Sequence, residues 1–130
     1  MKIMIVDDDI VSRKVLHQIM SEVGVCHEFD SGDVALYAFE TAITDKQPYN
    51  LVMLDINMPD MDGFEVMNRI HDIEMMKRTK PEKRVKIVMV TERNERSAVM
   101  QAVEAHCDDY VVKPYSRSIL NRLRRSELIK

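Results

Sequence analysis

The residues of this chain that could do chemistry each follow a short apolar run. Residues 7–9 are three consecutive aspartates after one such run, and Asp55 follows another, with Asn57 two positions later. Thr91 and Lys113 follow two further runs. Carboxylates and carbonyl oxygens are the hard ligands that Mg²⁺ prefers in proteins. The residue types therefore indicate a magnesium site with a hydroxyl and an ammonium group nearby.

Such a set of groups could support phosphoryl transfer. A carboxylate beside Mg²⁺ and a lysine can attack phosphorus as a nucleophile, which gives an aspartyl phosphate. The metal, the Thr91 hydroxyl and the Lys113 ammonium would then neutralise charge on the phosphoryl oxygens. Alternatively, any one of these residues alone could be a strand-end cap or a surface charge. Five such positions in one chain make that simpler explanation a poor one.

The elements that must position these residues alternate along the chain. Short, nearly continuous apolar runs predict buried strands at residues 3–6, 25–29, 51–54, 86–90 and 110–112. Apolar residues at helical spacing predict helices between and after them, within residues 11–23, 34–43, 64–73, 98–103 and 119–123. Ser31 and Ser116 are candidate N-caps of the second and fifth helices. The pattern predicts an α/β fold, a doubly wound parallel sheet built of five strand–helix units.

This architecture predicts where the chemistry lies. In open parallel sheets, ligands bind beyond the carboxyl ends of the strands. The acids, Thr91 and Lys113 all follow predicted strands directly, so we expect them to converge on one edge of the sheet.

Composition limits the other possible roles. At 130 residues we expect one domain, spanning residues 1–130. A formal net charge of −3 gives no general attraction to nucleic acid or anionic membranes. No apolar run approaches the ~20 residues of a membrane span, and no signal-peptide pattern is present. We therefore expect a cytoplasmic protein that does not bind membranes.

Four stretches carry a resemblance to a known family: "IMIVDDD", "LVMLDINMPDMDGFEVM", "KIVMVTE" and "DDYVVKPYS". In this order and spacing, over essentially the whole chain, they resemble the receiver domain of two-component response regulators, such as the chemotaxis regulators. The resemblance implies a flavodoxin-like (βα)5 fold with strand order 2-1-3-4-5. It also implies Mg²⁺-dependent transfer of a phosphoryl group to Asp55 from a phosphohistidine of a sensor histidine kinase or phosphotransfer protein.

The resemblance assigns roles to the metal-binding residues first. Asp7 and Asp8 would be the acidic pair, with Asp55 as a further ligand. Asn57 would bind the metal through its backbone carbonyl. Asp9 would be left to face solvent or cap the first helix, although Asp8 and Asp9 stay an alternative metal pair.

Other residues would sense the phosphoryl group. Lys113 would pair with it, before a cis peptide bond at Pro114. Thr91 and Tyr110 would move together on phosphorylation, although Tyr110 could instead be a static, half-buried tyrosine. The fourth helix, fifth strand and fifth helix, roughly residues 95–123, would form the output face for a downstream target protein, and a homodimer could form through it.

The chain departs from the family pattern after the fourth strand. Receivers usually carry a small residue where this chain has Glu92, a bulky carboxylate that would repel a phosphoryl group if it pointed inward. We expect it to point outward, and to slow phosphorylation or restrict the donors. Arg93, near the mouth of the site, would tune access of water. Residues 77–86 form a basic stretch that is either a solvated loop or a docking patch.

Three functions follow from these residues. The first is a phosphoacceptor switch that is not an enzyme in the ordinary sense. The second is a degenerate receiver that binds partners without phosphate, for which Glu92 is the reason. The third is a phosphatase with an aspartate nucleophile, which the missing second aspartate in "DIN" disfavours. No DNA-binding motif follows the last helix and the basic stretch lacks aromatics, so we expect no direct nucleic-acid binding.

Overall fold

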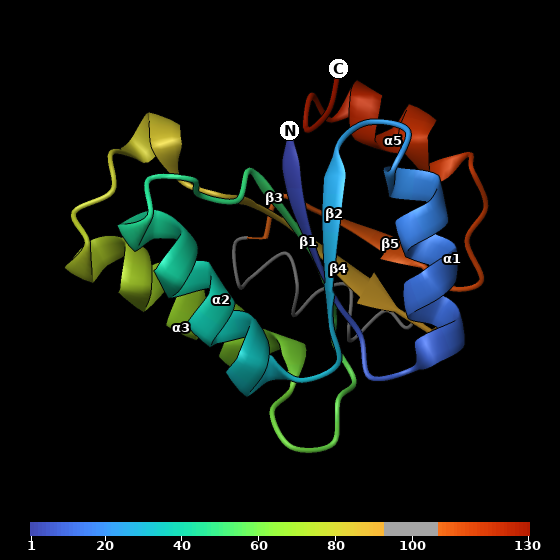
Figure 1. Ribbon diagram of the computed structural model, residues 1–130. Helices are drawn as coiled ribbons and strands as arrows, with labels where there is room; N and C mark the ends of the chain where they lie inside the picture. Colours follow the sequence, from blue (N-terminus) through green and yellow to red (C-terminus); the bar gives the residue numbers. More distant parts are fainter. Residues whose placement is uncertain (93–106) are drawn as a thin grey trace.

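Five parallel strands form one sheet in the order β2-β1-β3-β4-β5 in the computed structural model (Figure 1). The structure describes residues 1–92 and 107–130. The strands span Lys2–Val6 (β1), Val25–Phe29 (β2), Leu51–Asp55 (β3), Lys86–Thr91 (β4) and Asp109–Val112 (β5). The predicted strand order and the parallel, doubly wound topology are confirmed.

Helices cover both faces of this sheet (Figure 1). They span Ile10–Met20 (α1), Gly32–Thr44 (α2), Gly63–Met76 (α3) and Ile119–Arg125 (α5), with a short 3₁₀ turn at Pro81–Lys83 (η1). Helices α2 and α3 lie on one face, while α1 and α5 lie on the other. The predicted fourth helix, at residues 98–103, lies outside the described residues.

The central strands are buried on both faces, which explains their continuous apolar sequences. In β1, Met4 and Val6 pack in the core under α2 and α3, while Ile3 and Ile5 pack in the core under α1 and α5. All four are at most 1% exposed. Because successive side chains of a strand point to opposite faces, two cores require apolar residues at every position.

One of the two predicted helix caps is wrong. Helix α5 begins at Ile119, and the residue that precedes it is Ser118. The Ser116 hydroxyl instead lies 2.8 Å from that of Ser118, while the Ser116 carbonyl accepts from the Ile119 amide in a tighter turn. Ser31 does precede α2, but its side chain makes no capping hydrogen bond. The serine predicted for α2 thus lies directly before that helix, whereas the serine predicted for α5 lies two residues before the observed cap position.

The helices are short relative to a bilayer. Among the residues that the structure describes, no helix is long and apolar enough to cross a membrane.

Candidate functional site

Three charged side chains from three strands meet at the carboxyl edge of the sheet. The Lys113 ammonium lies 2.9 Å from Asp7 Oδ2 and 3.5 Å from Asp55 Oδ2. Asp7 follows β1, Asp55 ends β3 and Lys113 follows β5. Both carboxylates are 2% exposed. The sheet therefore brings together residues that are separated by up to 106 positions in the sequence.

The acids at this edge form a cluster with the chemistry of a magnesium site. Carboxylate oxygens of Asp7, Asp8 and Asp55 all lie within 4.8 Å of one another, and Asp8 is the exposed member. Hard oxygen donors of this kind, open to water on one side, suit Mg²⁺, which keeps several water ligands. The donor set that the chain presents therefore fits this ion.

The surroundings of Asp55 make its negative charge unfavourable. Burial and the neighbouring charge of Asp7 raise the pKa of Asp55 to about 7, although the Lys113 ammonium and the Asn57 amide oppose the shift. The Asn57 N–H donates to Asp55 Oδ1 at 3.1 Å. Asn57 is thus held beside Asp55 through its peptide group. A cation at the cluster would lower this pKa and favour the charged, nucleophilic form.

Backbone and side-chain donors fix Asp7 from two directions. The Asp9 N–H donates to Asp7 Oδ1 at 2.9 Å, and Arg13 Nη1 donates to the Asp7 carbonyl at 2.9 Å. Asp9 itself caps α1, since its carboxylate accepts from the Val11 amide and the Ser12 hydroxyl. The Asp9 carboxylate therefore caps α1 and is not a member of the acid cluster, as expected for the odd carboxylate of the run.

The loop after β5 is joined to the end of β4. The Lys113 N–H donates to the Thr91 carbonyl at 2.7 Å, and the peptide bond from Lys113 to Pro114 is cis. Thr91 is the last residue of β4 and is 4% exposed. Burial lowers the pKa of Lys113, but the two carboxylates outweigh it and leave that pKa raised. Lys113 therefore stays charged.

A second tether holds the same loop to α1. The Tyr115 hydroxyl donates to the Ser12 carbonyl at 2.9 Å. Burial raises the pKa of Tyr115, and the charges of Asp7 and Asp55 add to that effect. The phenol therefore stays protonated, and its hydroxyl can keep donating to the Ser12 carbonyl.

The ring of Tyr110 is held by α5. The Arg122 guanidinium lies 4.6 Å from the centre of this half-buried ring. Arg122 also binds Asp109, with Nη2 at 2.7 Å from Oδ1. A cation over an aromatic face stabilises that ring position, so any rotation of Tyr110 would have to give up this contact.

Glu92 lies at the entrance to the site. It is exposed, and with Val11, Val15, Lys113 and Tyr115 it lines a hollow between α1 and the ends of β4 and β5. Two of the apolar residues in this hollow are themselves exposed, Val11 at 68% and Val15 at 40%. Arg93, the other residue expected to control access, lies outside the described residues.

Gly63 sets the shape of the loop that follows Asp55. Its N–H donates to the Ile56 carbonyl at 2.8 Å, which closes the loop. A Cβ at Gly63 would lie 2.5 Å from the Asp55 carbonyl oxygen and 2.9 Å from the Ile56 Cα. Only glycine fits a backbone approach this close.

Sequence reasoning did not single out four of these residues. Arg13, Gly63 and Tyr115 each act through a contact with a backbone carbonyl, and Arg122 acts through a contact with the ring of Tyr110. The available signals were weak: Tyr115 lies two residues after Lys113, and Gly63 opens a helix. Neither pattern reveals the partner, because the partner comes from another strand or helix.

Comparison with known proteins identifies the family. The model of the response regulator receiver domain matches residues 3–124. The chain therefore belongs to the response regulator receiver domain family, as its motifs predicted. Receiver domains are the signalling switches of two-component systems, and they interact with histidine kinases and downstream effectors.

Two curated relatives differ in length. The transcriptional regulatory protein ResD of Bacillus subtilis is 33% identical over 125 residues, which is 95% of this chain and 46% of ResD. The chain thus spans about half of ResD. The chemotaxis protein CheY of Pseudomonas aeruginosa is 28% identical over 122 residues, 92% of this chain and 90% of CheY.

A solved structure supports the fold. The receiver domain of the histidine kinase CKI1 from Arabidopsis thaliana, complexed with Mg²⁺, superposes with a TM-score of 0.81 at 24% identity. The match covers 95% of this chain and 90% of that one. At this identity the similarity shows the fold alone.

Proposed function

We propose that this protein is a phosphoacceptor switch in which Asp55 receives a phosphoryl group from a phosphohistidine. The observation that carries the proposal is the Lys113 ammonium held 2.9 Å from Asp7 and 3.5 Å from Asp55 at the carboxyl edge of the sheet. A cation fixed between two buried acids is positioned to neutralise a phosphoryl group on the second of them. The family assignment supports the same reaction.

In this reaction an Asp55 oxygen forms the new bond to phosphorus as the bond from phosphorus to the histidine nitrogen breaks. The nitrogen keeps the bonding pair and takes up a proton from water. The Asn57 amide holds Oδ1 of Asp55, which leaves Oδ2, on the Lys113 side, as the attacking atom. Lys113 pairs with the charge that builds on the phosphoryl oxygens.

Asp7, Asp8 and Asp55 would hold Mg²⁺, with the Asn57 carbonyl as a further ligand. The ion would supply positive charge to the carboxylate cluster and to the incoming phosphoryl group. The hydrogen bonds from Asp9 and Arg13 to Asp7 keep one member of this ligand set in place. The exposure of Asp8 gives the ion a path from solvent.

The response to phosphorylation would pass through Thr91 and Tyr110. A phosphoryl group adds about −1.5 to −2 charges and strong acceptors at Asp55. The Thr91 hydroxyl would donate to it, and the ring of Tyr110 would turn into the space that this movement leaves. Arg122 would lose its contact with the ring, so the surface of β5 and α5 would change for a downstream target or a second copy of the chain.

The phosphodonor would approach over the hollow beside Lys113. Exposed Val11 and Val15 on α1 offer apolar contact there, and Glu92 lines the same hollow. With its side chain in solvent, Glu92 would leave the site open but repel anionic donors. A histidine kinase or a phosphotransfer protein would be the partner at this surface.

The domain organisation and cellular location are part of the same proposal. We infer that residues 1–130 form a single receiver domain and that the chain works in the cytoplasm. The output of the switch would be a protein–protein contact.

One experiment tests the function. The protein is incubated with Mg²⁺ and acetyl phosphate, and its intact mass is measured, with Asp55→Asn as the control. An added phosphate that the control lacks supports the switch. Absence of the adduct with small donors and with histidine kinases would support a degenerate receiver, and continuous release of phosphate from many substrates would support a phosphatase.

A further inference from the structure

The side of α2 that points away from the sheet carries uncharged residues at the spacing of a helix-pairing seam. Val34, Tyr37, Thr41 and Thr44 follow one another at intervals of three, four and three residues, and all are exposed. Tyr37 is 77% exposed and Val34 is 52% exposed. Apolar residues at this spacing face the partner helix in paired helices, and here Val34 and Tyr37 are the apolar members while Thr41 and Thr44 are polar. We refer to these four residues as the α2 seam.

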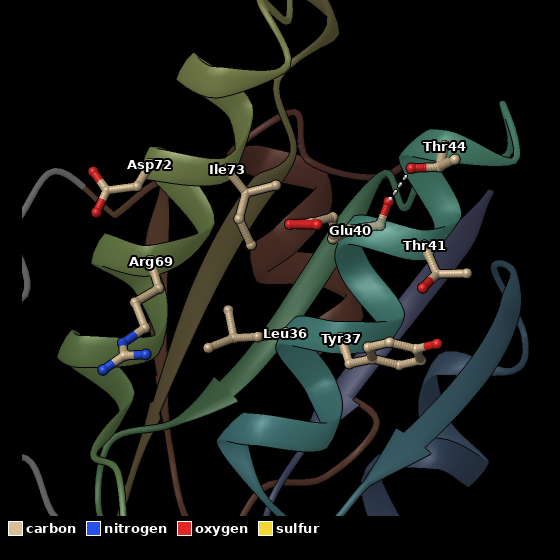
Figure 2. A pocket seen from close by; sticks show the side chains of 8 residues that line it. All are labelled: Leu36, Tyr37, Glu40, Thr41, Thr44, Arg69, Asp72 and Ile73. Carbon is tan, nitrogen blue, oxygen red and sulfur yellow. Dashed lines mark hydrogen bonds between the residues drawn. The ribbon is translucent and has the colours of Figure 1, made fainter.

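A hollow of about 440 Å³ lies between α2 and α3, next to this seam (Figure 2). Leu36 from α2 and Ile73 from α3 place apolar side chains in it. Figure 2 shows the side chain of Glu40 reaching from α2 toward α3 between them. The hollow therefore combines an apolar floor with a carboxylate, which suits a long basic side chain with an apolar stem.

Two of the three charged residues that line the hollow are acidic, Glu40 and Asp72, and the third is Arg69. Helix α2 contains Asp33 and Glu40, seven residues apart on one flank of the seam, and no lysine or arginine. Asp72 lines the hollow from α3. Within residues 1–92 and 107–130, the carboxylates of Glu40 and Asp72 make no hydrogen bond or ion pair. Arg69 lines the hollow and is paired with Glu65 at 3.0 Å, while the Lys77 ammonium lies 3.5 Å from the hydroxyl of Thr44, another lining residue.

From this arrangement we propose that the α2 seam and the adjoining hollow dock a basic amphipathic helix of a partner protein. Apolar residues of the partner pack on Tyr37 and Val34. A flanking lysine or arginine lays its stem over Leu36 and Ile73 and brings its charged head to Glu40. Acidic flanks of this kind select partners with basic residues at the matching positions and reject acidic ones.

This surface is separate from the phosphorylation site. Helices α2 and α3 cover the face of the sheet opposite α1 and α5, and neither the seam nor the hollow includes Thr91, Tyr110 or Lys113. The docking therefore goes beyond the switch and does not depend on it. It would hold the protein on a partner whether or not Asp55 carries a phosphoryl group.

The test uses a synthetic helical peptide with leucine at its core positions and lysine or arginine at the flanking positions. A second peptide with glutamate at those flanking positions is the comparison. Binding to the full chain is measured by fluorescence anisotropy, and the contacted amides are mapped by NMR on ¹⁵N-labelled protein. We expect the basic peptide alone to bind, with shifts concentrated in α2 and α3.

Paired variants separate this docking from general charge attraction. Glu40→Lys and Tyr37→Ala should each weaken binding of the basic peptide by about tenfold or more. Glu82→Lys and Met76→Ala change exposed residues outside the α2 seam and the lining of the hollow, and should alter binding by less than about twofold. Equal binding of both peptides, equal effects of the paired variants, or shifts outside α2 and α3 would overturn the proposal. Self-association that Tyr37→Ala abolishes would instead assign the surface to a second copy.

Discussion

At the scale of single residues, the site is an arrangement of charges that oppose one another. Asp55 is buried beside Asp7, and both effects raise its pKa to about 7, while Lys113 acts in the other direction. One ammonium shared between two carboxylates leaves the cluster short of positive charge. A cation bound by the carboxylates of Asp7, Asp8 and Asp55, as proposed above, would relieve this deficit.

The first prediction concerns the stability of the metal-free protein. The pKa of Asp55 is higher in the folded chain than in the unfolded chain, where it is about 3.9. Asp55 therefore binds its proton more tightly when folded, and its contribution to stability is lost as pH rises from about 4 through about 7. Asp55→Asn cannot lose a proton, so it should unfold at a temperature roughly 3–8 °C higher than wild type at pH 7.5.

The measurement is thermal unfolding by circular dichroism in buffer with a chelator. At pH 4 the two proteins should unfold at similar temperatures, because Asp55 is then protonated in the folded chain and about half protonated in the unfolded chain, which leaves little difference in bound protons. A difference that is the same at pH 4 and pH 7.5 would show that ionisation of Asp55 is not its cause.

The second prediction concerns Glu92 at the entrance. Its carboxylate lines the hollow with Lys113, so it should repel an anionic phosphodonor. Glu92→Ala should speed labelling by acetyl phosphate by roughly two- to tenfold, with the larger effect at low salt. The rate is followed by intact mass, and Glu82→Ala serves as an exposed control. No acceleration would mean that Glu92 does not limit access.

At the scale of the elements, short loops set the position of the reactive groups. The hydrogen bond from the Gly63 amide to the Ile56 carbonyl closes the loop after β3. The hydrogen bond from the Tyr115 hydroxyl to the Ser12 carbonyl ties the loop after β5 to α1. Each loop leaves a strand whose end is fixed by the sheet. The reactive side chains therefore stand on short, doubly anchored segments rather than on free loops.

The third prediction tests this anchoring at Gly63. A methyl group there would meet the Asp55 carbonyl oxygen at 2.5 Å, so Gly63→Ala must displace the backbone of the phosphorylation site. We expect a loss of about 1–3 kcal/mol in the free energy of unfolding and slower labelling of Asp55. Denaturant unfolding and labelling by acetyl phosphate measure the two effects.

Gly24→Ala is the matched control. Its methyl group would meet the Met1 carbonyl oxygen, also at 2.5 Å, at the opposite edge of the sheet. It should lower stability without changing the labelling rate of the folded protein. Equal slowing in both variants would mean that stability, not the position of Asp55, controls the rate.

At the scale of the whole molecule, the sheet turns distant residues into one binding site. Acids from the ends of β1 and β3 come within 4.8 Å only in the folded chain. A ligand that binds the folded state but not the unfolded state stabilises the fold by mass action. Binding of a cation at this edge should therefore be visible as a change in the stability of the entire domain.

The fourth prediction uses that link. Saturating Mg²⁺ should raise the unfolding temperature of the wild-type protein by several degrees, since a concentration about 100-fold above Kd adds about 2.7 kcal/mol. Asp8→Asn removes a proposed ligand and should lose most of this response. Asp9→Asn changes the neighbouring acid that caps α1 and should keep it. Scanning calorimetry with and without Mg²⁺ measures the shift in unfolding temperature. A shift in Asp8→Asn as large as that of the wild type would contradict the assigned ligands.

Much of the fold could be predicted from the sequence because burial on both faces leaves a plain signal. The run at residues 3–6 predicted β1 within one residue, and residues 25–29 predicted β2 as observed. The start of α5 was harder to predict. Ser116 and Ser118 are equally good caps by residue type, and packing of Ile119 and Leu120 against the core selects the later start.

The sequence by itself determined the kinds of groups at the site and the strand ends on which they lie. Residue type shows which groups are present, and the order along the chain shows which strand each group follows. Because strands in a parallel sheet place their carboxyl ends on one edge, these two facts are enough to bring the groups to one site. Only the tertiary structure decided the pairings: Lys113 between Asp7 and Asp55, Arg122 over Tyr110, and Gly63 against the Asp55 backbone. Such contacts depend on register and on side-chain direction between distant elements, and neither is encoded in local spacing.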